Sequence, residues 1–130
     1  MTIFGAIGIA STGMTVHRKW LDAISDNITN ANNVTATDQE AFHARYVVAR
    51  EITGGGVQVA GIVSSDGEGM MVSDPSHPLA DENGYVRHAD VDMASQMTQL
   101  IMAQRGYQAS AAVVDRAKAT YESALQIGRN

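Results

Sequence analysis

The sequence predicts an α+β fold, mainly α, in which long N- and C-terminal helices pack as a coiled coil and a small β-rich module lies between them. Apolar residues recur in alternating steps of four and three near both ends, the spacing of helices that pack together. The middle is instead rich in glycine and β-branched residues. We expect residues 1–31 to form the N-terminal helix of a helical core domain, residues 32–90 the β-rich module with its loops, and residues 91–130 the C-terminal helix of the core domain.

The N-terminal helix is expected to begin near Ile3 and to end near Thr29. Each glycine in a helix costs up to about 1 kcal/mol relative to alanine, so Gly5, Gly8 and Gly13 make its first half marginal alone. Asparagines end the helix, because their side chains compete with the helical backbone. The apolar stripe runs through Ile3, Ile7, Ala10, Met14, His17, Leu21, Ile24 and Ile28.

The β-rich module is expected to contain a hairpin. Residues 46–52 and 57–63 are rich in β-branched residues, and the glycines at 54–56 separate them. Further along, Asn83 and Gly84 are the favoured pair for a type I′ reversal, after which the chain continues in extended form.

The C-terminal helix is expected to begin where Asp90 or Asp92 caps its free N–H groups, and to run to about Ile127. A helix of about 35 residues would be roughly 50 Å long, which requires a partner helix. Its stripe runs through Met93, Met97, Leu100, Gln104, Tyr107, Ala111, Val114, Lys118, Tyr121 and Leu125. The polar members of the two stripes, His17, Gln104 and Lys118, could set the register, but the sequence favours solvent-facing positions for them.

Composition excludes several classes of protein. A net charge of −5 with few clustered basic residues argues against a nucleic-acid binder. No apolar stretch approaches the roughly 20 residues of a membrane span. The charges at Arg18 and Lys19 follow the first apolar run instead of preceding it, so we expect no cleaved signal peptide. The chain has no cysteine and hence no disulfide.

No catalytic, cofactor-binding or metal-binding residues are expected. The four histidines lack the spacing of a zinc site, and the acidic residues near position 82 are those of a solvated turn. No phosphate-binding glycine loop or nucleophile motif occurs. An enzyme that uses His77, Asp81 or His88 is the weakest of the alternatives that we consider.

Three motifs resemble a known family. Residues 24–32 read Ile-Ser-Asp-Asn-Ile-Thr-Asn-Ala-Asn, residues 77–86 read His-Pro-Leu-Ala-Asp-Glu-Asn-Gly-Tyr-Val, and residues 105–109 read Arg-Gly-Tyr-Gln-Ala. The first motif is similar to the N-terminal signature of bacterial flagellar rod and hook axial proteins, from which it departs at Asp26 and Thr29. Together the three resemble the FlgC family of proximal-rod proteins, with Ser110 where asparagine is usual.

The resemblance implies a structural axial subunit of the proximal rod of the flagellar basal body, and no enzyme. Such a subunit polymerises in the periplasm into a hollow drive shaft that transmits torque from motor to hook. It passes through the flagellar type III export apparatus without a cleaved signal peptide. Its partners are other copies and neighbouring rod proteins, with no nucleic acid, small-molecule substrate, cofactor or membrane span.

The expected assembly interface consists of the apolar stripes and two asparagines: Ile3, Ile7, Met14, Leu21, Ile24, Ile28, Asn30, Asn32, Met97, Leu100, Tyr107, Val114, Tyr121 and Leu125. The alternative function is a small coiled-coil adaptor that presents its β module to a regulatory partner. The sequence leaves open the copy number, the helical symmetry, the subunit that each stripe contacts and the state of the monomer.

Overall fold

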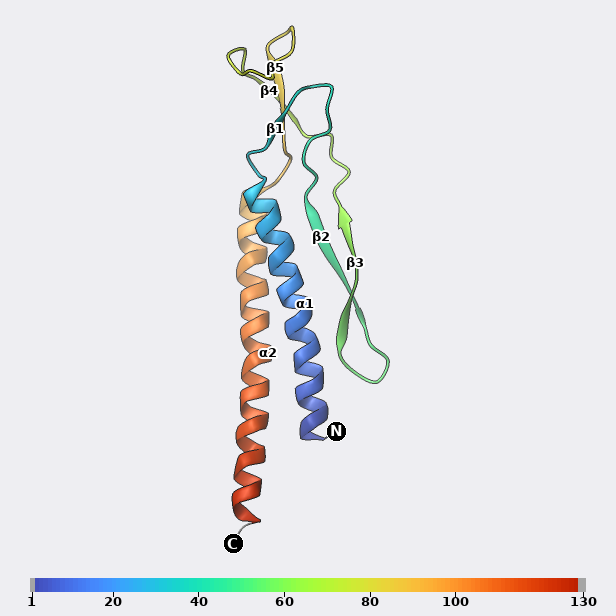
Figure 1. Ribbon diagram of the computed structural model, residues 1–130, viewed down its shortest axis with the longest axis vertical. Helices are drawn as coiled ribbons and strands as arrows, with labels where there is room; N and C mark the ends of the chain where they lie inside the picture. Colours follow the sequence, from blue (N-terminus) through green and yellow to red (C-terminus); the bar gives the residue numbers. More distant parts are fainter. Residues whose placement is uncertain (1, 129–130) are drawn as a thin grey trace.

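The computed structural model describes residues 2–128, and Met1, Arg129 and Asn130 lie outside the described part. Helix α1 (Ile3–Thr29) and helix α2 (Met93–Ile127) run side by side in opposite directions (Figure 1). A β-hairpin lies along α1, and a second small sheet lies beyond the end of the helix pair. The predicted α+β class is confirmed, with about half of the chain helical.

Side-chain caps fix the helix ends where the sequence predicts them. Thr2 Oγ1 accepts a hydrogen bond from the Gly5 N–H at 3.0 Å, and Asn30 is the C-cap of α1. Asp92 caps α2, since its Oδ1 accepts from the Ala94 N–H at 2.9 Å. These bonds satisfy backbone groups that have no partner inside the helix.

Strand β2 (Arg45–Glu51) and strand β3 (Val57–Ser64) form the predicted antiparallel hairpin. Gly54, Gly55 and Gly56 all have positive φ, between 96° and 119°, a conformation that glycine adopts without steric cost. The Ile52 N–H donates to the Gly56 carbonyl oxygen at 3.0 Å and closes the tip. A bulge between Val48 and Ala49 interrupts the register.

The hairpin tip contacts the glycine-containing half of α1. The Val57 N–H donates to Thr12 Oγ1 at 3.1 Å. At Gly55 an added Cβ would lie 2.9 Å from Ile9 Cδ1, so the tip rests directly on the helix. The hairpin therefore covers one side of α1, and α2 covers another (Figure 1).

The second sheet has the order β1 (Val34–Thr35), β5 (Tyr85–His88), β4 (Met70–Ser73), with both pairs antiparallel. Val86 of β5 is fully buried, and so is Ala44, which precedes β2, while Ala89 directly after β5 is also buried. The Ala89 N–H donates to the Asn33 carbonyl oxygen at 3.0 Å, which joins the chain leaving α1 to the chain entering α2.

The turn before β5 differs from the prediction. A type I′ turn needs positive φ at two residues, but Gly84 has φ +79° and no non-glycine residue between 2 and 128 has positive φ. Asp81 determines the turn instead, because its Oδ1 accepts from the N–H groups of Asn83 and Tyr85, each at 2.9 Å. The type I′ prediction for Asn83-Gly84 is therefore wrong.

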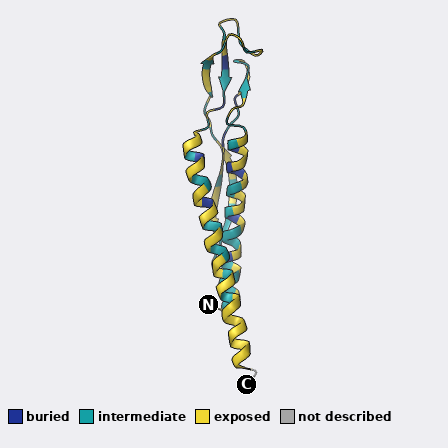
Figure 2. Cartoon of the chain, turned by 90° about the vertical axis from the view of Figure 1, so that its left-hand side faces the viewer, coloured by how far each residue is buried: buried dark blue, intermediate teal, exposed yellow. Residues whose placement is uncertain are grey.

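Few residues of the helix pair are buried, and they are mostly small. Figure 2 shows that the outer faces are exposed and that the last turns of α2 are exposed all round. The buried residues of α1 are Ala10, Val16, Ala23, Ile24 and Asn27, and those of α2 are Gln96 and Ala103.

At Gly106, α2 leaves room for a side chain of α1. A Cβ added there would overlap the imidazole ring of His17. His17 is half-buried and stacks on Trp20 with ring centroids 6.1 Å apart. The glycine thus makes the space that the ring occupies, at the usual cost of glycine in a helix.

We expect Gly106→Ala to destabilise the chain by about 1–3 kcal/mol, because overpacking outweighs the gain in helix propensity. In a His17→Ala background the same change should be neutral or stabilising. Chemical denaturation followed by circular dichroism measures both. An equal loss in the two backgrounds would show that the His17 ring is not what the glycine accommodates.

Candidate assembly interface

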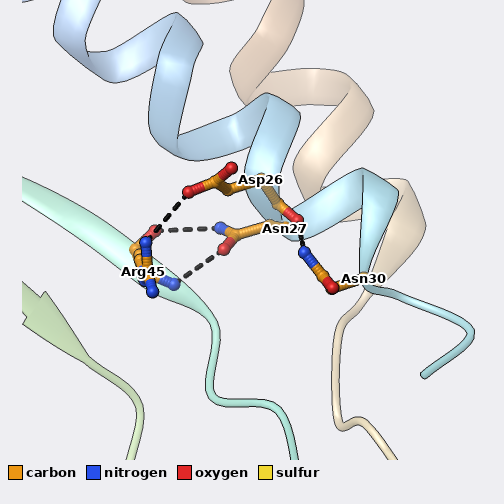
Figure 3. A network of polar contacts seen from close by, with 4 residues as sticks. All are labelled: Asp26, Asn27, Asn30 and Arg45. Atoms are coloured by element: carbon orange, nitrogen blue, oxygen red, sulfur yellow. Dashed lines mark hydrogen bonds and ion pairs between the residues drawn. The ribbon is translucent and has the colours of Figure 1, made fainter. Parts of the chain in front are cut away.

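A buried polar junction joins α1, β2 and α2, and Figure 3 shows its bonds between α1 and β2. Asn27 is only 1% exposed. Its Nδ2 donates to the Arg45 carbonyl oxygen at 2.9 Å and to Gln96 Oε1 at 3.1 Å, and its Oδ1 accepts from the Arg45 N–H at 2.7 Å. One side-chain amide therefore holds the start of the hairpin and the start of α2 against the end of α1.

The surface contacts around this junction are weaker. Arg45 Nη1 lies 3.0 Å from Asp26 Oδ2, but both side chains are about half exposed, at 52% and 54%. Asn30 Nδ2 donates to the Asp26 carbonyl oxygen at 2.9 Å, also at the surface. Exposed ion pairs contribute about 0–1 kcal/mol, so the buried amide and not the ion pair holds the junction.

A second polar contact between the helices involves Trp20, whose Nε1 donates to Gln99 Oε1 at 3.3 Å. His17 lies beside it, and its Nδ1 is buried without a hydrogen-bond partner among the described residues. The predicted solvent-facing position is therefore wrong for His17, because Gly106 gives its ring room between the helices. Gln104 and Lys118 are exposed, as predicted.

The stripe predicted on α1 faces inward along its whole length. Ile24 is 1% exposed, and the other five predicted residues are half-buried: Ile3, Ile7, Met14, Leu21 and Ile28. Helix α1 contacts both α2 and the hairpin of the same chain, which accounts for the partial burial of these residues. A role between subunits stays a prediction for these residues.

On α2 the most buried positions are Gln96 and Ala103, which lie between the predicted ones. Of the predicted residues, Leu100, Tyr107 and Val114 are half-buried. The remaining three, Met97, Tyr121 and Leu125, are 45%, 40% and 53% exposed. The stripe of α2 that faces α1 is therefore rotated by about one residue from the predicted stripe, and it is made of smaller side chains.

The two predicted asparagines lie after α1. Asn30 is half-buried and caps the helix, and Asn32 is exposed. The residue that joins the elements is Asn27, which sequence reasoning treated as capping chemistry. The sequence did contain a signal for this role of Asn27. A polar residue one turn before a helix end, on the inward face beside Ile24, needs a buried hydrogen-bond partner.

Much of the surface of α2 is apolar. Its exposed large apolar residues are Met93, Met97, Ile101, Met102, Val113, Tyr121, Leu125 and Ile127. Scattered exposed apolar residues are normal, but so many on one helix indicate a surface that another protein covers.

Two aspartates of the β-rich module, Asp74 and Asp81, accept hydrogen bonds within its turns. The Tyr85 N–H, followed by the Asn83 N–H, lowers the pKa of Asp81 by stabilising its carboxylate. The Ser76 hydroxyl does the same for the pKa of Asp74. Because folding lowers these two pKa values, the ionised carboxylates stabilise the folded chain at neutral pH. This stabilisation is lost only as the pH falls through the lowered pKa values.

Residues 2–128 contain no group of three or more histidine, aspartate or glutamate side chains placed to hold a metal ion. Within the same residues, neither helix has a stretch that is apolar and long enough to cross a membrane.

Residues 82–127 match the family model described as flagellar basal body rod FlgEFG protein C-terminal. The chain is also 32% identical to the flagellar basal-body rod protein FlgC of Salmonella typhimurium, over 99% of this chain and all of that protein. The chain belongs to the FlgC family of flagellar basal-body rod proteins. FlgC of Borreliella burgdorferi is 30% identical over 98% of each chain, and FlgC of Bacillus subtilis is 25% identical over 99% of this chain.

Membership of the FlgC family confirms the resemblance that the three motifs indicate. FlgC proteins are structural subunits of the flagellar basal-body rod and not enzymes. The prediction of a structural rod subunit is thus confirmed, and the coiled-coil adaptor is not favoured. The first motif, residues 24–32, also has a structural role in this chain. It contains Asn27, which joins the end of α1 to the start of the hairpin.

We expect Asn27→Ala to destabilise the chain by between about 1 and 3 kcal/mol, because it leaves the Arg45 N–H and the Gln96 side chain buried without partners. Asn30→Ala is the matched control and should cost less than about 1 kcal/mol, because its bond is exposed. Thermal unfolding of both variants makes the comparison, and equal losses would contradict the role given to the buried amide.

Proposed function

We propose that this chain polymerises with further copies and with neighbouring rod proteins into the hollow proximal part of the rod, which transmits torque from motor to hook. The observation that carries the proposal is the exposed apolar surface of α2. Gln96 and Ala103 are the only residues of this helix, Met93–Ile127, that the chain itself buries. Such a surface has a free-energy cost in water and is relieved when neighbouring subunits cover it.

The helices act as the assembly core, with residues 1–31 and 91–130 packed as a coiled coil near the axis. Their heptad spacing and antiparallel contact support this arrangement. Residues 32–90 form the module on the outside of the core. The fourteen residues of the predicted interface contribute contacts both within a subunit and between subunits.

A contact between different surfaces of identical subunits generates a helical filament wherever the rotation between neighbours does not close into a ring. The exposed residues of α2 and the open apolar groove between the helices and the hairpin tip are different surfaces of this kind. They are therefore suited to an axial polymer more than to a closed dimer.

The subunit reaches the periplasm through the flagellar type III export apparatus, without a cleaved signal peptide. Export of an unfolded chain is favoured by low stability of the isolated subunit. Three glycines in the first half of α1 and a small buried core support low stability. The absence of cysteine means that no disulfide has to form after export.

Leu125→Asp should abolish swimming and incorporation into basal bodies, because a charge in a subunit contact is costly to bury. The isolated subunit should change by only about 0.5 kcal/mol, since Leu125 is exposed within the chain. Gln126→Asp is the control, as its exposed side chain lies about 100° round the helix. Normal motility in a Leu125→Asp strain would refute the proposed contact.

Hydrogen exchange tests the order of folding and assembly. Amides of residues 118–127 should exchange rapidly in the monomer and be protected in isolated basal bodies, because these residues are exposed within the chain and their proposed covering partners are other subunits. Protection that is already complete in a monomer that does not enter basal bodies would favour the adaptor instead.

A further inference from the structure

The helix pair carries an open apolar groove near the hairpin tip. It has a volume of about 610 Å³. Four residues of α1 line it, Ala6, Ile9, Ala10 and Gly13, together with Ala109 and Val113 of α2 and Gly56 of the hairpin. Because Ala6, Ala10 and Gly13 are small, a helix laid in the groove could approach α1 closely at these positions. Among residues 2–128, no charged side chain lines the groove.

The stripe of α2 that faces α1 continues beyond the end of α1. Ser110, Val114 and Ala117 are half-buried, and the same helical spacing leads on to Tyr121 and Leu125. In the first turn of α1, the Phe4 ring lies 5.4 Å from that of Tyr121. From Lys118 to Gly128 every residue is exposed (Figure 2). The apolar stripe is thus continuous with the contact between the two helices, and beyond Tyr121 its member Leu125 is exposed among the described residues.

We propose that the last three turns of α2 of one subunit, led by Tyr121 and Leu125, occupy this groove on a second copy of the chain. This inference rests on the proposed function and names one of its contacts. The exposed end of the stripe then contacts α1 of the second copy. Within one chain, α1 covers the part of the same stripe that lies before Lys118. The large side chains of the helix end fit the side of α1 where small residues leave room.

The chain cannot make this contact with itself. Ala109 and Leu125 lie on one continuous helix, about 24 Å apart at 1.5 Å per residue. Two copies joined in parallel by this contact are therefore offset by about 24 Å along the helix direction. The contact joins two different surfaces, so it can be repeated from subunit to subunit.

Engineered cysteines test the contact directly, because the chain has none of its own. The variant with Ala109→Cys and Leu125→Cys is produced in motile cells, and basal bodies are oxidised and run without reductant. A disulfide needs Cα atoms within about 7 Å, which these positions meet only between subunits. We expect a dimer of the chain. Ala109→Cys with Gln126→Cys is the control and should remain monomeric.

The readouts separate this inference from the proposed function. Swimming cells with no dimer in either variant would overturn the groove contact and leave the rod subunit standing. A cross-link to a rod protein of different mass would overturn the second copy as occupant. If Leu125→Cys prevents incorporation, Ala109→Cys with Gly128→Cys probes the same stripe three residues later, and a monomer there also overturns the contact.

Discussion

The buried amide of Asn27 is the interaction on which the arrangement of the other elements depends. It satisfies the first N–H group and carbonyl of β2 and holds Gln96 of α2, all at the end of α1. From this point the hairpin runs back along α1 (Figure 1). Because the amide is buried, losing one partner costs more than losing any exposed contact nearby.

Most of the fold could be predicted from local chemistry. The helix bounds follow from Thr2, Asn30 and Asp92, whose caps act on adjacent backbone groups. The hairpin follows from β-branched runs around three glycines. The type of the turn at Asn83-Gly84 was predicted wrongly, because the prediction used the type I′ turn that this residue pair favours. In the structure the Asp81 carboxylate accepts hydrogen bonds from the N–H groups of Asn83 and Tyr85 and determines a different turn.

The contact surface of the helices was harder to predict. Heptad reasoning selects large apolar residues, but α2 turns Gln96, Ala103 and Gly106 toward α1. Small residues allow close approach, and a buried glutamine is acceptable because Asn27 supplies its partner. Neither fact is visible from one helix alone, since each depends on the residue opposite. The larger side chains of α2 remain outside, where sequence reasoning had expected contacts with other subunits.

The hairpin tip has a consequence for how the monomer opens. It rests on Ile9 and Thr12, in the part of α1 that glycine weakens most. The hairpin tip therefore holds the first turns of α1 in the helical state. If these turns unwind, the tip loses the surface on which it rests, so the two open together. Residues distant in sequence thus form one cooperative opening unit, and a substitution at the tip changes the local opening equilibrium of a helix more than forty residues away.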